Sequence, residues 1–412
     1  MRTIHNLDLC TGIGGFTFAH RDIPEIETIC TAEVDSYCSR HIDQNLGLDN
    51  AGDVELLLTS RENHPHKEFV EKDLVPVEET GFTSLCMEDF LEGILPFPTM
   101  ITAGSPCQQV SEANTKYNHL GIQGDDSKLV HKILDYVEDL MPDYFLLENS
   151  ARLNKRGLIH ILMRLSKIGY IIEFETVTAA AVGLSHLRHR IYVVAYLRTT
   201  PLATNNIRAF ESLRRTAARM TPNKHFPLTN ELTSEQIDNF TVDVPKSIPL
   251  RTRRIKALGN SIVPEIPRLI YKSIIKAEKM GHGKKKATPR KGEVHEATAY
   301  SDGWFKGQAT LFDAPMEITE TQTRGIVINC ELYSGEPDRR LNPSKNDHQH
   351  LWSTIHARDG SNNFNPSRLE RPGKLGGINQ SLMLATGKRS GAAHPLFGEL
   401  LMGYPPKYTE LP

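Results

Sequence analysis

Short apolar runs alternate with segments of helical spacing in this chain, and this alternation constrains the fold more than any other feature. The run Tyr144-Phe145-Leu146-Leu147 lies between two such segments. One has apolar residues at 129, 130, 133, 134, 137 and 140, the other at 158, 159, 162, 165 and 168. The short run is typical of a buried strand, and the spaced patterns are typical of helices packed on a sheet. Their alternation predicts a doubly wound, mostly parallel α/β sheet with helices on both faces.

Three of the apolar runs carry reactive or charged residues at one end. These are Gly104-Ser105-Pro106-Cys107 after the run 99–102, Glu148-Asn149 after the run 144–147, and Arg188 with Arg190 before the run 191–197. Proline holds the thiol on a stiff turn, and open α/β sheets place reacting groups at strand ends. Taken singly, Cys107 reads as a buried small hydrophobe and the arginines as a solvated face. Together they predict one pocket that holds a thiol, a carboxylate and guanidinium groups.

A glycine-rich loop follows the first predicted strand, Ile4–Leu9, and reads Cys10-Thr11-Gly12-Ile13-Gly14-Gly15-Phe16. Glycines at such positions let the backbone approach a ligand. A second strand, 26–32, ends at Glu33-Val34-Asp35, roughly 20 residues on, where dinucleotide-binding folds keep an acid for ribose hydroxyls. Loop and acid together favour an adenosine-containing cofactor, whereas either alone fits a tight turn or a solvated acid. Asp89 is an expected contact of the cofactor base or an exposed acid.

Composition limits the classes of function. Lys and Arg number 48 and Asp and Glu 50, so nucleic-acid binding requires a local basic surface. The six cysteines form no C-x-x-C pair and no spacing typical of zinc, which indicates free thiols in a reducing compartment and no metal site. No apolar segment is long enough to span a bilayer, so we expect a cytoplasmic protein.

The sequence divides into three regions. Residues 1–280 carry the alternating pattern, with a polar surface insertion at about 47–82. A lysine-rich stretch, 281–299, reads as a linker, and 300–412 has little helical periodicity. The arginines at 208–219 predict an exposed basic helix. We expect phosphate contacts from this helix, from 251–256 and from 284–291, although the last stretch fits a solubilising tether equally well.

Several of these motifs, in this order, resemble those of the DNA (cytosine-5)-methyltransferase family of bacterial or phage type over roughly residues 4–275. The loop Asp8–Phe16 is similar to the family's cofactor loop and Glu33 to its ribose-binding acid. The other similar segments are Gly104–Gln108 with Ser111 and Ala113 (nucleophile loop), Phe145–Asn149 (Glu-Asn motif), Arg188 with Arg190 (arginine motif), and Ala257–Pro264 with Asn260 and Ser261 (last motif).

The resemblance implies a Rossmann-like methyltransferase fold, S-adenosylmethionine as cofactor and double-stranded DNA as substrate. The Cys107 thiolate would attack C6 of a flipped-out cytosine. Glu148 would bond N3 and the exocyclic amine, and Arg190 would hold the ring carbonyl with support from Arg188. The base that removes the C5 proton is not identified, and a cognate restriction endonuclease as partner is left open.

The sequence departs from the family pattern in three ways. Cys10 replaces an aromatic residue and His186 a glutamine, and the segment before Ala257 is short for a target-recognition domain. A long tail follows, ending in Leu401-Met402-Gly403-Tyr404-Pro405-Pro406, a phrase similar to one near the family's recognition region. We therefore expect 300–412 to supply or complete target recognition. The alternatives are RNA cytosine methylation or another C5 modification, a non-catalytic DNA-binding relative, and a nicotinamide oxidoreductase, which leaves Pro-Cys-Gln and Glu-Asn unexplained.

Overall fold

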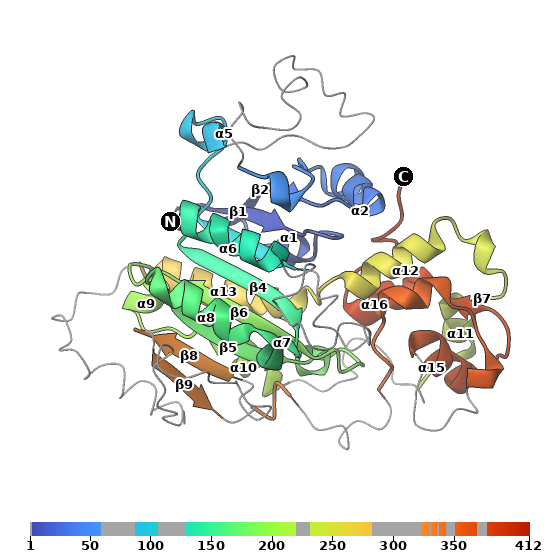
Figure 1. The fold of residues 1–412 in the computed structure, drawn as a ribbon. Coiled ribbons are helices and arrows are strands. Elements are labelled where there is room, and N and C mark those ends of the chain that lie inside the picture. The colour runs from blue at the N-terminus through green and yellow to red at the C-terminus, as the bar shows by residue number, and fades with distance from the viewer. Residues whose placement is uncertain are drawn as a thin grey trace, which may run out of the picture.

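An eight-stranded sheet forms the centre of the computed structural model (Figure 1). The strand order is β2-β1-β3-β4-β6-β5-β8-β9. The strands are β1 Ile4–Leu9, β2 Ile26–Ala32, β3 Met100–Gly104, β4 Tyr144–Ser150, β5 Ile171–Val177, β6 Arg190–Tyr196, β8 Arg324–Ile328 and β9 Glu331–Gly335. The structure describes residues 2–58, 87–105, 128–219, 231–281, 324–329, 331–335, 338–342, 351–368 and 377–412.

The sheet is mostly parallel, as predicted. Strands β2, β1, β3 and β4 pair in parallel, whereas β6 is antiparallel to both β4 and β5, and β8 to both β5 and β9. Only β6 and β8 of these strands therefore run against the rest. The start of β6 consequently meets the carboxyl end of β4, which brings Arg190 opposite Ser150. The central strands are apolar almost throughout because helices cover both faces.

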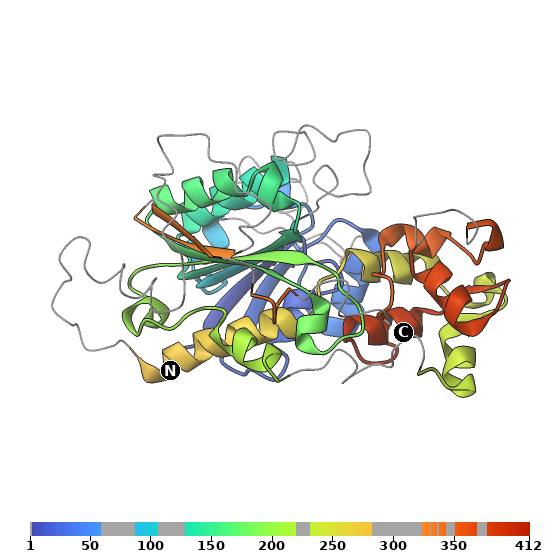
Figure 2. The same cartoon turned by 90° about the horizontal axis from the view of Figure 1, so that it is seen from below.

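Helices cover each face of the sheet, as Figure 2 shows. One face carries α6, Lys128–Leu140, and α8, Leu158–Lys167, whose predicted apolar positions join the core there. The other face carries α1 Gly15–Ala19, α9 Pro201–Thr204, α10 Glu211–Ala217 and α13 Glu265–Met280. Both helices expected from apolar spacing around the 144–147 strand are confirmed.

A smaller lobe lies beyond the carboxyl ends of the parallel strands, on the right in Figure 1. Its helices are α11 Ser234–Phe240, α12 Arg251–Asn260, α15 Gly377–Thr386 and α16 Pro395–Met402. It also contains a short antiparallel pair of strands, β7 Thr241–Val242 and β10 Ala392–Ala393. Phe397 of α16 packs edge-on against Phe240 and Trp352 at its centre. Only four residues separate α12 from α13, so the lobe continues directly into the main sheet's covering helix.

The remaining helices are short. They are α2 Ser36–His41, α5 Met87–Leu91 and α7 Leu153–Arg156, a π-helical turn at Ile42–Leu46, and 3-10 turns at Val54–Leu56, Ala179–Val182, Pro245–Ser247, Ala357–Ser361 and Pro366–Arg368. Cys10, Cys30 and Cys38 are free thiols. Among the described residues, no helix combines the length and apolar character needed to cross a bilayer.

The structure corrects two expected segment assignments. The insertion does not begin at 47, because Val54 and Leu57 are buried and their carbonyls accept bonds from the hydroxyl of Tyr136 at 2.6 and 2.8 Å; residues 59–82 lie outside the described part. The helix at 208–219 is not simply exposed, since Arg214 turns inward and pairs with buried Glu175 at 2.6 Å.

The described part of 300–412 is divided between two places. β8 and β9 extend the main sheet, and residues 351–368 and 377–402 belong to the small lobe. Most of the expected linker 281–299 lies outside the described residues. The role of 300–412 in target recognition stays a prediction.

Candidate active site

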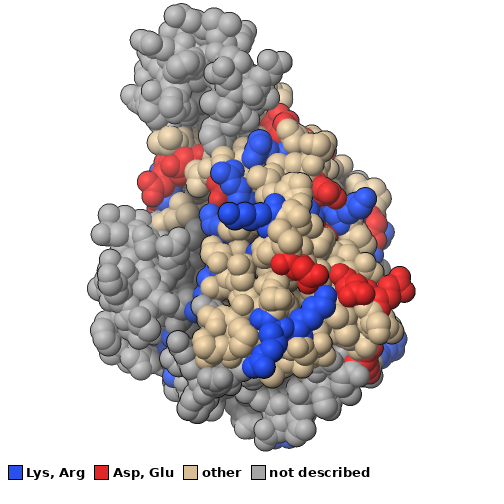
Figure 3. All heavy atoms as spheres, turned by 90° about the vertical axis from the view of Figure 1, so that its right-hand side faces the viewer, with Lys and Arg blue, Asp and Glu red and all other residues tan. Residues whose placement is uncertain are grey.

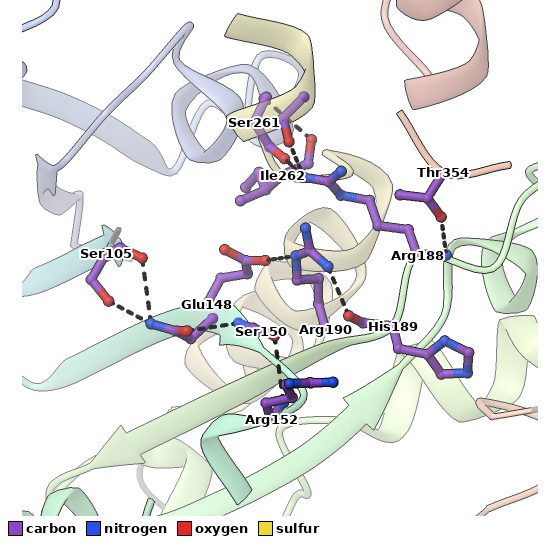
Figure 4. Close-up of polar contacts among 12 residues, drawn as sticks. Ser105, Glu148, Ser150, Arg152, Arg188, His189, Arg190, Ser261, Ile262 and Thr354 are labelled. Atoms are coloured by element: carbon purple, nitrogen blue, oxygen red, sulfur yellow. Dashed lines mark hydrogen bonds and ion pairs between the residues drawn. The ribbon is translucent and has the colours of Figure 1, made fainter. Parts of the chain in front are cut away.

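The Glu148 carboxylate and the Arg190 guanidinium face each other at the carboxyl edge of the sheet (Figure 4). Arg190 Nε lies 2.8 Å from Glu148 Oε1. Glu148 is 6% exposed, and this burial raises its pKa, while the guanidinium groups of Arg190 and Arg188 act in the opposite direction. Desolvation prevails because it penalises the charged carboxylate. The result is a carboxyl group that keeps its proton to a higher pH than a free glutamate does.

The Arg188 guanidinium lies beside Ser261 and Ile262, above this pair in Figure 4. Its guanidinium donates to the main-chain carbonyls of Ile355 at 3.2 Å, Gly259 at 3.1 Å and Ser261. Its backbone N–H donates to Thr354 Oγ1 at 3.0 Å, and its φ of 25° is unusual for a non-glycine residue. Arg188 is thus a positioning residue. It connects the segment that leads into β6 to the end of α12 and to the segment around Ile355, both in the small lobe.

Asn149 fixes the end of β3 beside Glu148. Its Nδ2 donates to Ser105 Oγ at 2.8 Å, and both side chains are buried. Gly104 stands opposite Glu148 in the register of β3 and β4. The chain therefore leaves the sheet next to the carboxylate and continues into Pro106 and Cys107. Cys107 itself lies outside the described residues.

A second polar site surrounds the glycine-rich loop. Glu33 Oε2 accepts the N–H of Gly12 at 2.8 Å, and Oε1 accepts the N–H of Asp35 at 2.7 Å. Burial raises the pKa of Glu33. A cavity of about 250 Å³ opens here, lined by Gly12, Glu33, Lys256 and Asn260 among others. The strand-end acid and the last motif, more than 200 positions apart, therefore meet at one cavity beside the loop.

The other predicted cofactor residues lie at different depths around this cavity. Asp8 is fully buried, and its carboxylate accepts the hydroxyls of Thr17 at 2.9 Å and Thr102 at 3.0 Å; its contact with the cofactor stays a prediction. Buried as well are Thr11, Gly15, Phe16 and Ser261, whereas Cys10 is partly exposed. Gly14 and Cys10 both have positive φ. Val34 is exposed beside Glu33, and Asp89, on α5, is not among the residues that line the cavity.

Two tyrosines near the end of the chain hold the glycine-rich loop, which was not expected from the sequence. The Tyr408 hydroxyl donates to the Ile13 carbonyl at 2.7 Å, and the Tyr404 hydroxyl bonds Ser261 Oγ. Their rings stack with centroids 4.4 Å apart. A Cβ on Gly15 would lie 2.9 Å from the Tyr404 hydroxyl, so only glycine fits there without a shift. The Gly-Tyr-Pro-Pro phrase marks this segment in the sequence, but not its contact with the loop.

Comparison with known proteins identifies the family of the chain. The profile of the family described as C-5 cytosine-specific DNA methylase matches residues 4–344, most of the chain. Type II methyltransferase M.Sau3AI of Staphylococcus aureus is 36% identical over 104 residues, covering 24% of this chain and 25% of the relative. Type II methyltransferase M2.BsuMI of Bacillus subtilis is 32% identical over 162 residues, covering 36% of this chain and 41% of the relative. The chain thus spans less than half of either relative.

Two solved structures are also similar. The Dnmt2 methyltransferase of S. pombe aligns with a TM-score of 0.32 and 16% identity over 47% of this chain and 49% of its own. An E. coli structure titled as a putative prophage-encoded DNA modification methyltransferase gives a TM-score of 0.32 and 17% identity over 59% and 56% of the two chains.

Proposed function

The chain belongs to the C-5 cytosine-specific DNA methylase family, and on that premise we propose that it transfers a methyl group to carbon 5 of cytosine in double-stranded DNA. The observation that carries the proposal is the buried Glu148–Arg190 pair, 2.8 Å apart, beside the point where the chain leaves β3 for Pro106-Cys107-Gln108. A pure DNA-binding relative has no need for a thiol, a carboxyl group and a guanidinium at one strand edge.

In this mechanism the Cys107 thiolate forms a bond to C6 of the cytosine. The electron pair of the C5–C6 double bond shifts toward C4 and N3. Burial raises the pKa of Glu148; in its protonated form Glu148 donates to N3 and so stabilises the charge that develops there. Arg190 orients Glu148 and holds the ring carbonyl. After C5 is methylated, the C5 proton is lost. The electron pair of its bond restores the C5–C6 double bond, and the Cys107 sulfur leaves C6 as a thiolate. Because C6 is stacked in a duplex, the base must be flipped out.

S-adenosylmethionine is the proposed cofactor, and it supplies an electrophilic methyl group when bound. The cavity beside the glycine-rich loop fits an adenosine-type group by its chemistry. Each Glu33 oxygen accepts one backbone N–H and keeps a lone pair for a ribose hydroxyl, while Asn260 lines the same cavity. Gly12 and Gly14 bring the main chain close to that space through positive φ.

Replacing Glu33 by glutamine should weaken S-adenosylmethionine binding by roughly 10- to 100-fold, since a hydrogen bond to a charged group contributes about 1.5–3 kcal/mol. The side-chain nitrogen would also face the Gly12 or Asp35 N–H, donor against donor. Titration calorimetry with the cofactor measures the change. Glu27→Gln, an exposed acid on the same strand, serves as the matched control. Equal affinity in both variants would place the cofactor elsewhere.

We assign target recognition to the small lobe, formed by α11, α12 and, among the described residues, 351–368 and 377–402. Its position beyond the carboxyl ends of the parallel strands, the edge at which Glu148 lies, supports this assignment. The described part of the face in Figure 3 carries Lys and Arg interspersed with Asp and Glu rather than one basic patch. Of the cations expected to touch phosphate, Arg251 and Arg254 are buried instead: Arg251 donates to the Ala393 carbonyl at 2.8 Å and Arg254 pairs with Glu399.

The proposal also sets partners and location. Double-stranded DNA would be the substrate, in the cytoplasm of a prokaryotic or phage-infected cell. Relatives from bacteria and from a Bacillus phage support that setting. The names of the type II relatives leave room for a cognate restriction endonuclease, which is part of the proposal only as a partner to be sought.

The deciding experiment is transfer of a labelled methyl group from S-adenosylmethionine to mixed-sequence duplex DNA, with RNA in parallel. We expect label on DNA, recovered as 5-methylcytosine after digestion to nucleosides. Label on RNA alone would overturn the choice of substrate, and label on neither would overturn the activity.

A further inference from the structure

A cavity outside the active site is lined mainly by arginines. It measures about 420 Å³ and opens between α10, the start of β8 and the turn after β9. The arginines are Arg208, Arg214, Arg215, Arg219, Arg324 and Arg340. Of the described residues that line it, only Glu211 is acidic. We call it the arginine cleft.

The arginine cleft shares the sheet edge with the active site. Glu148, Tyr192, Glu175 and Arg324 stand opposite one another in register across β4, β6, β5 and β8. Paired residues on neighbouring strands project from the same face. Three strand spacings of about 4.8 Å put Arg324 roughly 14 Å from Glu148. Figure 1 shows β5, β8 and α10 together in the lower part of the molecule, at the β9 end of the sheet. A ligand that covers Glu148 and is longer than this distance can reach both.

Ion pairs within the protein neutralise part of the positive charge of the arginine cleft. Arg214 pairs with Glu175 at 2.6 Å, Arg340 with Asp338 at 2.6 Å, and Arg215 with Glu211. Glu173 also acts on Arg214. The described residues that line the cleft nevertheless include six arginines and one glutamate, and burial raises the pKa of Glu175 to about 7, which weakens the negative charge beside Arg214. A concave surface with a net positive charge attracts anions.

We propose that the arginine cleft binds the phosphodiester backbone of the DNA that flanks the flipped cytosine, an inference that rests on the proposed function. Guanidinium groups match phosphate oxygens in a bidentate way. Each DNA strand carries one charge per about 3.4 Å of helix axis, so a reach of roughly 14 Å corresponds to about four base-pair steps from the target. Arg324 and Arg340, which come from the far side of the expected linker, thus join the basic residues at 208–219 in one site.

The test compares two double variants in duplex binding. Arg215→Ala with Arg219→Ala removes two exposed arginines of the cleft. Lys272→Ala with Lys279→Ala removes two exposed cations of α13 at the opposite edge, where Lys279 pairs with Glu25 just before β2. Each pair contains one residue with a known acid partner, so the two variants are matched. Fluorescence anisotropy of a labelled mixed-sequence duplex gives Kd over a series of salt concentrations, and thermal unfolding checks that both variants are folded.

For wild type and the lysine variant we expect the same slope of log Kd against log salt concentration. The arginine variant should bind more weakly, with a slope smaller by about 2, because each lost phosphate contact removes roughly 0.9. Identical slopes in all three proteins, with methyl transfer to DNA intact, would overturn the inference and leave the proposed function standing. Binding of inorganic tripolyphosphate is measured on the same three proteins. If the arginine variant loses it while its DNA slope is unchanged, the inference is overturned and a free polyphosphate is the ligand. A wild type that neither binds nor methylates DNA would instead refute the proposed function.

Discussion

Replacing Glu148 by glutamine is expected to lower the rate of methyl transfer by roughly 10²- to 10⁴-fold, the usual contribution of a positioned general acid. Glutamine keeps the size of the side chain but cannot deliver a proton to N3. It also replaces one carboxyl oxygen by an NH₂ group, so Arg190, whose Nε lies 2.8 Å from Glu148 Oε1, can meet a donor where it now meets an acceptor. Transfer of labelled methyl groups under single-turnover conditions measures the chemical step apart from product release.

The pH dependence distinguishes loss of the proton from general damage. Burial raises the pKa of Glu148, so its protonated form persists above the pH at which a free glutamate ionises and is lost as the pH rises through the folded value. The wild-type rate should therefore fall on the alkaline side where Glu148 ionises. The glutamine variant should lack that decline. A variant that keeps the decline, or that retains at least a tenth of the wild-type rate, would contradict the assigned role.

Two controls complete this prediction. Glu138 is an exposed acid of α6 that pairs with Arg164 of α8. Its replacement by glutamine should leave the rate unchanged. Cys107→Ala should abolish transfer altogether, because no bond to C6 can then form. Binding of duplex DNA by the Glu148 variant, measured separately, shows whether the loss lies in chemistry or in binding.

Local patterns were sufficient to predict β1 to β4 and β6 and the helices α6 and α8, but not β8 and β9, which lie in the region expected to serve target recognition. The segment 128–140 repeats apolar residues at helical spacing, and Val130, Ile133 and Val137 are buried as that spacing requires. Glu148 could be placed at a strand end by sequence because the buried run before it fixes the end of β4. Parallel pairing brings the carboxyl ends of β1, β3 and β4 together, whereas Arg190 reaches Glu148 because β6 is antiparallel to β4.

Contacts between distant segments were beyond such patterns. Nothing near Arg188 indicates that its guanidinium reaches the carbonyls of Gly259 and Ile355, nor does the sequence of α10 show that Arg214 pairs inward with Glu175. Asp8 belongs to the cofactor loop by sequence, yet Thr17 and Thr102 enclose its carboxylate. A charged residue in a motif can contact a ligand or support the backbone beneath it, and only the tertiary partners distinguish the two.

Replacing Glu399 by glutamine should lower the free energy of unfolding by about 3–5 kcal/mol, the usual cost of removing one partner from a buried ion pair. Glu399 is fully buried on α16 and pairs with Arg254 at 3.1 Å. Its oxygens also accept the N–H of Lys407 at 2.8 Å and of Thr409 at 3.0 Å. An amide offers one oxygen where the carboxylate offers two, so an NH₂ group must face one of these donors. Chemical denaturation measures the loss.

The same substitution should weaken cofactor binding, because Glu399 anchors the segment from which Tyr408 holds the glycine-rich loop at Ile13. Glu410→Gln, an exposed acid of that segment, is the matched control and should change neither quantity. Pairing Glu399→Met with Arg254→Met removes both charges at once, and buried pairs replaced in this way often recover stability. Such recovery without recovery of cofactor affinity would show that the Lys407 and Thr409 bonds position the loop. A loss below about 1 kcal/mol in Glu399→Gln would instead mean that the C-terminal segment is held by the tyrosines alone.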